Sequence, residues 1–290
     1  MMKMSKGEKC FQVFNYIILA LVAVVTLYPL IYVLSASVSD PQALSAGKVW
    51  LLPKGFRLDS YREVVKFSGI WTSYLNSIFY TVGATLAGVV LTVLGAYPLS
   101  KKRLRGKKFF TIMFSVVMWF HVGMIPYYLN LKNLSLLNSR LGIILIFCIS
   151  SFYLFIMRSA FEGVPETLEE SAKIDGANDI IIAFKIYLPL VKPSLITIGL
   201  YYMVSKWNAY FWPMILLKDD SKIPLQVILQ KIIVDANVAD EMGTVMNVAG
   251  YSKETLIYAT IAVAIIPMIA VYPFAQKYFT KGMMVGAVKG

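Results

Sequence analysis

The sequence predicts an all-α membrane protein with six transmembrane helices and both termini in the cytoplasm. Three observations support this prediction. The chain of 290 residues is 58% hydrophobic and only 15% charged, whereas soluble domains are about 25% charged. Its apolar residues form six runs, most of them close to the roughly 20 residues that a helix needs to cross a bilayer. Lys and Arg are concentrated in alternate connections between these runs.

Each predicted helix is a mainly apolar run, and polar connections separate the runs. The first run is longer than the apolar core of a signal peptide and lacks a small-residue cleavage site after it, so we interpret it as a retained helix. No internal repeat is evident, which favours one membrane domain over residues 1–290. The predicted spans are Phe14–Leu34, Leu75–Leu99, Phe109–Leu129, Leu141–Met157, Leu195–Leu217 and Leu256–Phe279.

The basic residues predict the orientation, because Lys and Arg accumulate on the cytoplasmic side of membrane proteins. With the N-terminus inside, 16 of the 28 Lys and Arg residues lie in inner connections, and 11 lie in the longer outer ones. The basic run Lys101–Lys108 is the strongest single signal, since it is short and lies between two spans. We interpret it as a topology anchor, with recognition of lipid headgroups as the alternative. The net charge of +12 then indicates contact with a membrane surface and not with nucleic acid.

The sequence lacks the residues that several kinds of chemistry require. Cys10 and Cys148 are too few for a disulfide framework, and one histidine, His121, cannot form a zinc site alone. The phosphate-binding pattern G-x-x-x-x-G-K-[ST] is missing from the sequence. The sequence therefore predicts a chain without catalytic residues, metal or cofactor, whose energy source would be a partner.

The longest predicted cytoplasmic connection, residues 158–192, has the pattern of two short helices joined by a tight turn. Pro165 suits the first turn of a helix, and the glutamates after it favour the positive end of the helix dipole. Gly176 suits the turn, because glycine readily adopts φ > 0. Ala177–Tyr187 then predicts the second helix.

Two motifs resemble one protein family. The loop sequence Glu170-Ser171-Ala172-x-x-Asp175-Gly176-Ala177, with Leu188-Pro189-Leu190-x-x-Pro193 after it, resembles the EAA loop of the permease subunits of bacterial ATP-binding cassette (ABC) importers. The C-terminal sequence Lys277–Gly290 resembles the tail of the carbohydrate-type, maltose-permease-like branch. The loop departs from the usual pattern in two places, with Ser171 in place of alanine and Ala183 in place of an aromatic residue.

This resemblance implies the transmembrane domain of a type I ABC importer in the bacterial cytoplasmic membrane. It also implies four kinds of partner: a second homologous permease that completes a heterodimer, an ATPase dimer that binds ATP and Mg, an extracytoplasmic binding protein and an oligosaccharide substrate. The loop would be the coupling helix that inserts into a cleft of the ATPase. The residues assigned to this contact are Glu169, Glu170, Ser171, Ala172, Asp175, Gly176 and Ala177.

The fifth predicted span contains the most unusual residue of the membrane segments, Lys206, because an ionisable group there is costly unless it faces protein or water. Hydroxyl, amide and aromatic side chains share its face of the helix and suit the binding of a sugar. Lys206 would add affinity for a carboxylate, so an acidic oligosaccharide is one possible substrate. The alternatives are that Lys206 pairs with a neighbouring helix or that this face packs on the second permease. The substrate-pathway candidates are Tyr201, Tyr202, Ser205, Lys206, Asn208, Trp212 and His121.

The outer segment Lys218–Thr255 would face the binding protein, with Asp219, Asp220, Gln226 and Gln230 as candidate contacts. A stand-alone secondary transporter or channel is the alternative function. That class would require coupling carboxylates within the spans, yet the six predicted spans contain no Asp or Glu. An intramembrane enzyme would require a paired nucleophile and base, which His121 alone does not supply.

Overall fold

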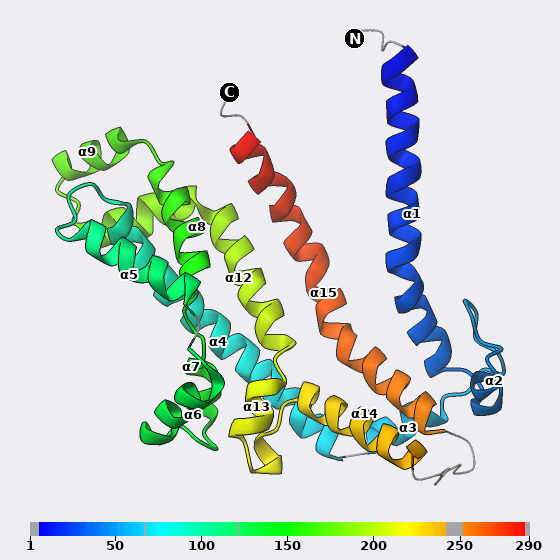
Figure 1. Cartoon of the computed structure of the whole chain (residues 1–290). Coiled ribbons are helices and arrows are strands. Elements are labelled where there is room, and N and C mark those ends of the chain that lie inside the picture. The colour runs from blue at the N-terminus through cyan, green and yellow to red at the C-terminus, as the bar shows by residue number, and fades with distance from the viewer. Residues whose placement is uncertain (1–5, 67, 121, 242–251, 288–290) are drawn as a thin grey trace. The chain divides into compact units, whose positions relative to one another are not determined.

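The computed structural model describes residues 6–66, 68–120, 122–241 and 252–287, and these residues form helices and loops without a β-strand (Figure 1). They divide into two compact units, one of residues 1–70 and 229–266 and the other of residues 71–228 and 267–290. Three of the described helical segments are long and apolar enough to cross a membrane: Gly7–Ser37, Gly69–Ser100 and Lys253–Pro273. They lie where the first, second and sixth spans are predicted.

The first unit contains helices α1 (Lys6–Ser37), α2 (Pro41–Ser45) and α3 (Asp59–Lys66). Its contacts gather at the C-terminal end of α1, where Ala36 is fully buried and Tyr32 makes an edge-on ring contact with Tyr258 at 5.7 Å between centroids. The most apolar window of α1 is not buried by the rest of the chain. A helix of this composition is typical of a segment that faces lipid or another subunit.

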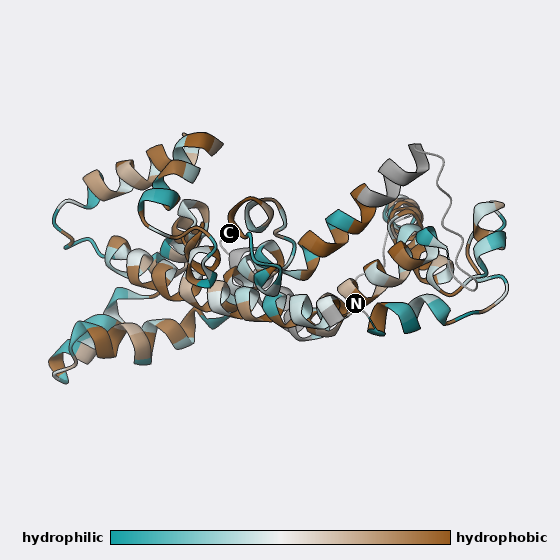
Figure 2. Ribbon diagram, turned by 90° about the horizontal axis from the view of Figure 1, so that it is seen from below, coloured by the Kyte–Doolittle hydropathy of each residue, from teal (hydrophilic) through white to brown (hydrophobic). Residues whose placement is uncertain are grey.

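The second unit is built around α4 (Ser68–Ser100), α8 (Ser151–Glu162) and α12 (Lys192–Trp207). Hydrophobic residues line the long helices, and hydrophilic residues are concentrated in the connections (Figure 2). The largest buried side chains of this core come from α4, α8, α12 and the loop between α8 and α12: Leu99, Leu154, Met157, Phe161, Ile182 and Ile198.

The remaining elements are short or shared between the units. The connecting elements of the second unit are α5 (Lys107–Trp119), α6 (Met124–Asn133), α7 (Arg140–Leu145), α9 (Glu166–Ile174), α10 (Asp179–Ile181), the π-helix η1 (Ile182–Tyr187), α11 (Leu188–Leu190), α13 (Phe211–Leu216) and the 3₁₀-helix η2 (Asp220–Lys222). Helices α14 (Leu225–Glu241) and α15 (Lys253–Ala287) contain residues of both units.

The third predicted span, Phe109–Leu129, is not one helix. Helix α5 ends at Trp119, Phe120 is extended, and α6 begins at Met124 with its axis bent by 118° from that of α5. Gly123 precedes α6, and Pro126 lies in its first turn, where proline is tolerated because the backbone N–H has no helical acceptor. The prediction of a continuous helix was wrong here because the apolar run conceals a helix stop and a new start.

The fourth and fifth predicted spans, Leu141–Met157 and Leu195–Leu217, are also interrupted. Between α7 and α8, Phe147 has a φ of +49° and Ser150 caps the new helix by accepting a hydrogen bond from the Tyr153 N–H at 3.5 Å. Helix α12 ends at Trp207, and α13 begins only at Phe211. The interruption between α7 and α8 exposes backbone groups that the distant side chains of Tyr202 and Lys206 satisfy, as described below.

Candidate functional site

The loop between α8 and α12 forms the helix–turn–helix that its sequence predicts. Helix α9 begins after Pro165 and ends at Ile174, and Gly176 follows with a φ of +78°. The Ala177 N–H donates to the Ala172 carbonyl at 2.9 Å and the Gly176 N–H donates to the Lys173 carbonyl at 3.0 Å. This pair of bonds is the Schellman motif, which depends on a residue in the left-handed region. The turn at Gly176 is therefore confirmed.

A buried ion pair attaches α9 to the end of α4. The Lys101 Nζ atom lies 2.6 Å from a Glu169 carboxylate oxygen, and both residues are less than 10% exposed. Lys173 and the Tyr187 hydroxyl donate to the same carboxylate at 2.6 and 3.0 Å, and Arg103 lies 3.5 Å away. Burial by itself would raise the pKa of Glu169, but the hydrogen bonds from Lys101, Lys173 and Tyr187 outweigh it and lower the pKa to about 2.

The basic run Lys101–Lys108 makes further ion pairs with the same loop. Lys102 pairs with Glu166 at 2.7 Å, Lys107 pairs with Glu162 at 3.2 Å, and Arg103 pairs with Asp179. The Lys102–Glu166 and Arg103–Asp179 pairs are largely exposed, so each contributes little stability. The run therefore has a structural contact in addition to the topological role predicted for it. The complementary charges of the two segments are the sequence feature that could have predicted this contact.

The candidate coupling residues are divided between the interior and the surface of this loop. Glu169 and Ala172 are buried and Ala177 is half-buried, whereas Glu170, Ser171, Asp175 and Gly176 are exposed. Sequence reasoning missed the apolar residues of the same surface: Ile174 is 87% exposed and Ile180 is 70% exposed, with Phe184 also exposed. The sequence feature that could have identified these residues is the presence of apolar side chains on both sides of an otherwise polar turn.

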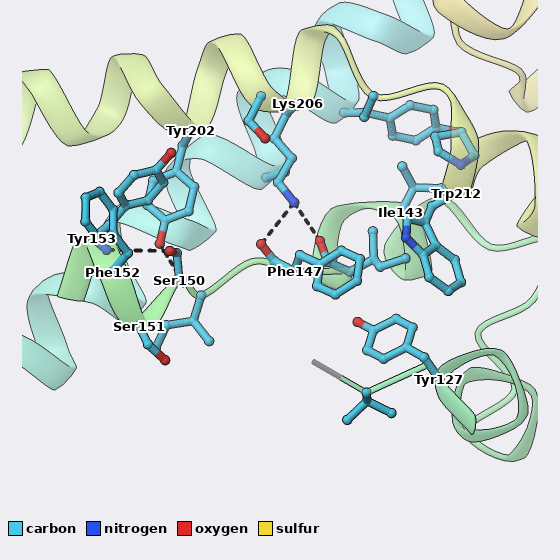
Figure 3. Close-up of a pocket in the computed structure, with 18 of the residues that line it drawn as sticks. Tyr127, Ile143, Phe147, Ser150, Ser151, Phe152, Tyr153, Tyr202, Lys206 and Trp212 are labelled. Carbon is cyan, nitrogen blue, oxygen red and sulfur yellow. Dashed lines mark hydrogen bonds between the residues drawn. The ribbon is translucent and has the colours of Figure 1, made fainter. Parts of the chain in front are cut away.

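A cavity of about 740 Å³ lies within the second unit, beside the interruptions of the predicted spans (Figure 3). Lys206 of α12 extends into its wall, where the Nζ atom donates to the carbonyls of Ile146 and Phe147 at 2.6 and 3.0 Å. The described residues that line the cavity include no Asp or Glu. Lys206 thus contacts the backbone of the non-helical segment between α7 and α8, and none of the described residues that line this wall offers it a carboxylate.

The predicted pathway residues are only partly brought together. Tyr202, Ser205, Lys206 and Trp212 line the cavity, whereas Tyr201 and Asn208 are not among the residues that line it. The Tyr202 hydroxyl already contacts Thr92 at 2.8 Å and accepts a hydrogen bond from the Ser150 N–H at 3.0 Å, so this residue has a structural role. Trp212 reaches the cavity from α13 and not from the face of one long helix. His121 lies outside the described residues.

Three aromatic rings from different elements meet at one end of the cavity. The rings of Tyr127 and Phe147 are stacked at 4.7 Å with an angle of 8° between their planes, and Trp212 lies edge-on to Tyr127 at 5.0 Å (Figure 3). Sequence analysis missed Tyr127 and Phe147 because they belong to spans predicted as continuous helices. We refer to Tyr127, Phe147 and Trp212 as the aromatic cluster.

The candidate contacts for a binding protein lie after α13. Asp219 accepts hydrogen bonds from the Ser221 N–H and hydroxyl at 3.0 and 2.7 Å and lies 3.4 Å from the Lys222 ammonium, so it stabilises the turn η2. Asp220 is exposed, and Gln226 and Gln230 are half-buried. Of these four side chains, Asp220 is thus the most accessible.

Comparison with known proteins identifies the family. Residues 108–285 match the sequence model of a family that is described as "binding-protein-dependent transport system inner membrane component". The polygalacturonan/rhamnogalacturonan transport system permease protein YtcP of Bacillus subtilis is 40% identical over 286 residues, which are 98% of this chain and 99% of that protein. The arabinooligosaccharides transport system permease protein AraQ of Halalkalibacterium halodurans is 25% identical and is covered to 94%, with 93% of this chain aligned.

A solved structure agrees with these relatives. It is the crystal structure of a bacterial ABC transporter involved in the import of the acidic polysaccharide alginate, and one of its chains matches with 44% sequence identity and a TM-score of 0.88. The match covers 96% of this chain and 100% of that chain. The resemblance predicted from the EAA loop and the C-terminal sequence is confirmed: this chain belongs to the family of binding-protein-dependent transport system inner membrane components and is a permease subunit of an ABC importer.

Proposed function

We propose that this permease carries an acidic oligosaccharide, delivered by an extracytoplasmic binding protein, across the bacterial cytoplasmic membrane. The observation that carries the proposal is the chemistry shared by two relatives that are at least 40% identical. One is named for polygalacturonan and rhamnogalacturonan, and the other for alginate. Polymers of this kind contain uronic acids, whose carboxylates would be attracted to Lys206 in the cavity.

The coupling of transport to ATP is proposed to occur at the turn after α9. The exposed residues Asp175 and Gly176, together with Ile174 and Ile180, form a small protrusion with an apolar surface. Such a protrusion suits insertion into a cleft of an ATPase subunit, because its apolar side chains would leave water on docking. The ATPase dimer would bind ATP and Mg, and a second, homologous permease would complete the translocation pathway.

The proposed topology has six crossings with both termini in the cytoplasm. Helices α1, α4 and α15 would cross as continuous segments. The pairs α5–α6, α7–α8 and α12–α13 would cross as interrupted segments. Non-helical backbone at membrane depth is tolerated where it is buried in protein or lines a cavity, and the interruptions near Phe147 and Ala209 border the cavity. Asp219, Asp220, Gln226 and Gln230 would then face the binding protein.

Reconstitution tests this function. The chain, its second permease, the ATPase and the binding protein are placed in proteoliposomes with ATP on the ATPase side, and uptake of labelled trigalacturonate and a neutral trisaccharide is measured. We expect uptake of the acidic sugar that requires both ATP and the binding protein. Asp175→Arg should reduce uptake while ATP hydrolysis persists. Uptake of equal rate without the ATPase would overturn the proposal, and preference for the neutral sugar would overturn the substrate class.

A further inference from the structure

We propose that the cavity beside Lys206 is a binding subsite for one uronate residue of the substrate, contained entirely within this chain. In this subsite the Lys206 ammonium would bind the sugar carboxylate, and the aromatic cluster would contact the apolar face of the sugar ring. The inference rests on the proposed function, because it assigns a location and a binding mode to the acidic substrate. It adds Tyr127 and Phe147, which come from two other segments of the chain, to the residues of α12 and α13.

The first step concerns the charge of Lys206. An ammonium group has three N–H donors, and two of them are directed at the Ile146 and Phe147 carbonyls. These acceptors are neutral, so they orient the side chain and leave its positive charge uncompensated. Because no Asp or Glu is found among the described residues that line the cavity, an anionic ligand would supply the missing countercharge and accept the third hydrogen bond.

The second step concerns the aromatic cluster. Its three rings come from α6, from the interruption between α7 and α8, and from α13, and they meet within 5.7 Å between centroids. Phe147 belongs to both parts of the proposed subsite, since its ring stacks on Tyr127 while its carbonyl accepts a hydrogen bond from Lys206 (Figure 3). The carboxylate-binding group and the apolar surface are therefore held at a fixed separation, which suits a ring that carries its charge at one edge.

The third step concerns the size and polarity of the remaining wall. A volume of about 740 Å³ lies within the roughly 300–1,000 Å³ of typical ligand pockets. Ser150, Ser151 and Ser205 contribute hydroxyl groups to the wall, and Ser150 caps helix α8, whose N-terminal end favours negative charge. Sugar hydroxyls would find partners here, so the subsite offers a place for the charged group, the apolar face and the polar edge of a uronate.

Uptake kinetics in the reconstituted complex test the subsite. Lys206→Met should raise the KM for trigalacturonate by about tenfold to a hundredfold, the effect of losing one charge-assisted hydrogen bond. The KM for the fully methyl-esterified trisaccharide should change less than threefold. Lys206→Arg should recover most of the discrimination. Lys132→Met, which removes an exposed charge of α6 that does not line the cavity, is the matched control and should leave both KM values unchanged.

A labelling experiment gives an answer that does not depend on transport. Ser205→Cys, in a chain whose two native cysteines are replaced by serine, is exposed to an anionic thiol reagent in the assembled complex. We expect labelling that trigalacturonate slows and that the methyl ester slows less, and Lys206→Met should abolish this difference. Because this readout measures protection by the sugar and not uptake, it tests the role of Lys206 even if the Lys206→Met complex does not transport.

The outcomes separate the two proposals. Uptake of trigalacturonate by the unmodified complex, with the same ratio of acidic to esterified KM in Lys206→Met, would overturn the subsite and leave the proposed function intact. Failure of the unmodified complex to import trigalacturonate would overturn the substrate class itself. Equal protection of Ser205→Cys by the acidic sugar and its ester would also overturn the role of Lys206.

Discussion

The buried ion pair between Lys101 and Glu169 should be the main attachment of the loop between α8 and α12, and Glu169→Gln tests this. The pKa of Glu169 falls from 4.5 to about 2, and one pKa unit corresponds to about 1.4 kcal/mol. The folded protein therefore favours the carboxylate by about 3 kcal/mol. Removing one partner of a buried pair costs about 3–5 kcal/mol in other proteins, which agrees with this magnitude.

Thermal unfolding of the purified chain in detergent, followed by intrinsic fluorescence, measures the effect. At about 2–4 °C per kcal/mol, we expect Glu169→Gln to lower Tm by roughly 6–12 °C. Glu166→Gln is the matched control, because it removes an ion pair at 2.7 Å whose Lys and Glu side chains are 83% and 61% exposed. It should cost less than about 1 kcal/mol.

A double substitution separates loss of the pair from loss of the residue. Lys101→Met combined with Glu169→Gln removes both charges, so it should regain much of the stability that Glu169→Gln loses, since no uncompensated ammonium remains buried. Equal Tm values for Glu169→Gln and Glu166→Gln would refute the reasoning, because the buried geometry would then contribute no more than the exposed one.

Four further outcomes are expected. Because the pKa of Glu169 is lowered by Lys101, Lys173 and Tyr187, its contribution to stability is complete above about pH 4.5 and is lost as the pH falls toward 2, so pH-dependent unfolding of Glu169→Gln should lack this decrease. Gly176→Ala should cost about 1 kcal/mol in thermal unfolding, because its φ of +78° disfavours a Cβ atom that would otherwise meet open space. Gly176→Pro also removes the N–H that donates to Lys173 and should uncouple ATP hydrolysis from uptake in proteoliposomes, and normal uptake would contradict this. Tyr202→Phe should cost about 1–3 kcal/mol by leaving the Ser150 N–H without its acceptor, yet the ratio of acidic to esterified sugar uptake should stay the same.

The long helices and the turn at Gly176 could be predicted from local signals. Helices α1, α4 and α15 lie where uninterrupted apolar runs predict them, because backbone hydrogen bonding and side-chain hydrophobicity are properties of the segment itself. The turn at Gly176 followed from glycine's tolerance of positive φ. The family was likewise accessible from short motifs, since the residues of the EAA loop are adjacent in the chain.

The interruptions of the other three predicted spans could not be predicted from local signals. The mean hydropathy of each apolar run is high throughout, so it does not show that helices stop near Phe120, Phe147 and Ala209. The stop at Phe147 is stabilised by Lys206, which is 59 residues away in the sequence. Hydropathy reports what a segment contains, whereas a helix ends where distant groups can satisfy its free carbonyls.

From its composition and motifs alone, the chain could be recognised as a helical permease with a tight turn at Gly176. Its folded structure added the pairing of Lys101 with Glu169 across 68 residues and the meeting of Tyr127, Phe147 and Trp212 beside Lys206. The physical reason is that charge compensation and ring stacking act over a few ångströms in space. These distances are set only when the helices pack, so they could not be derived from the positions of the residues in the sequence.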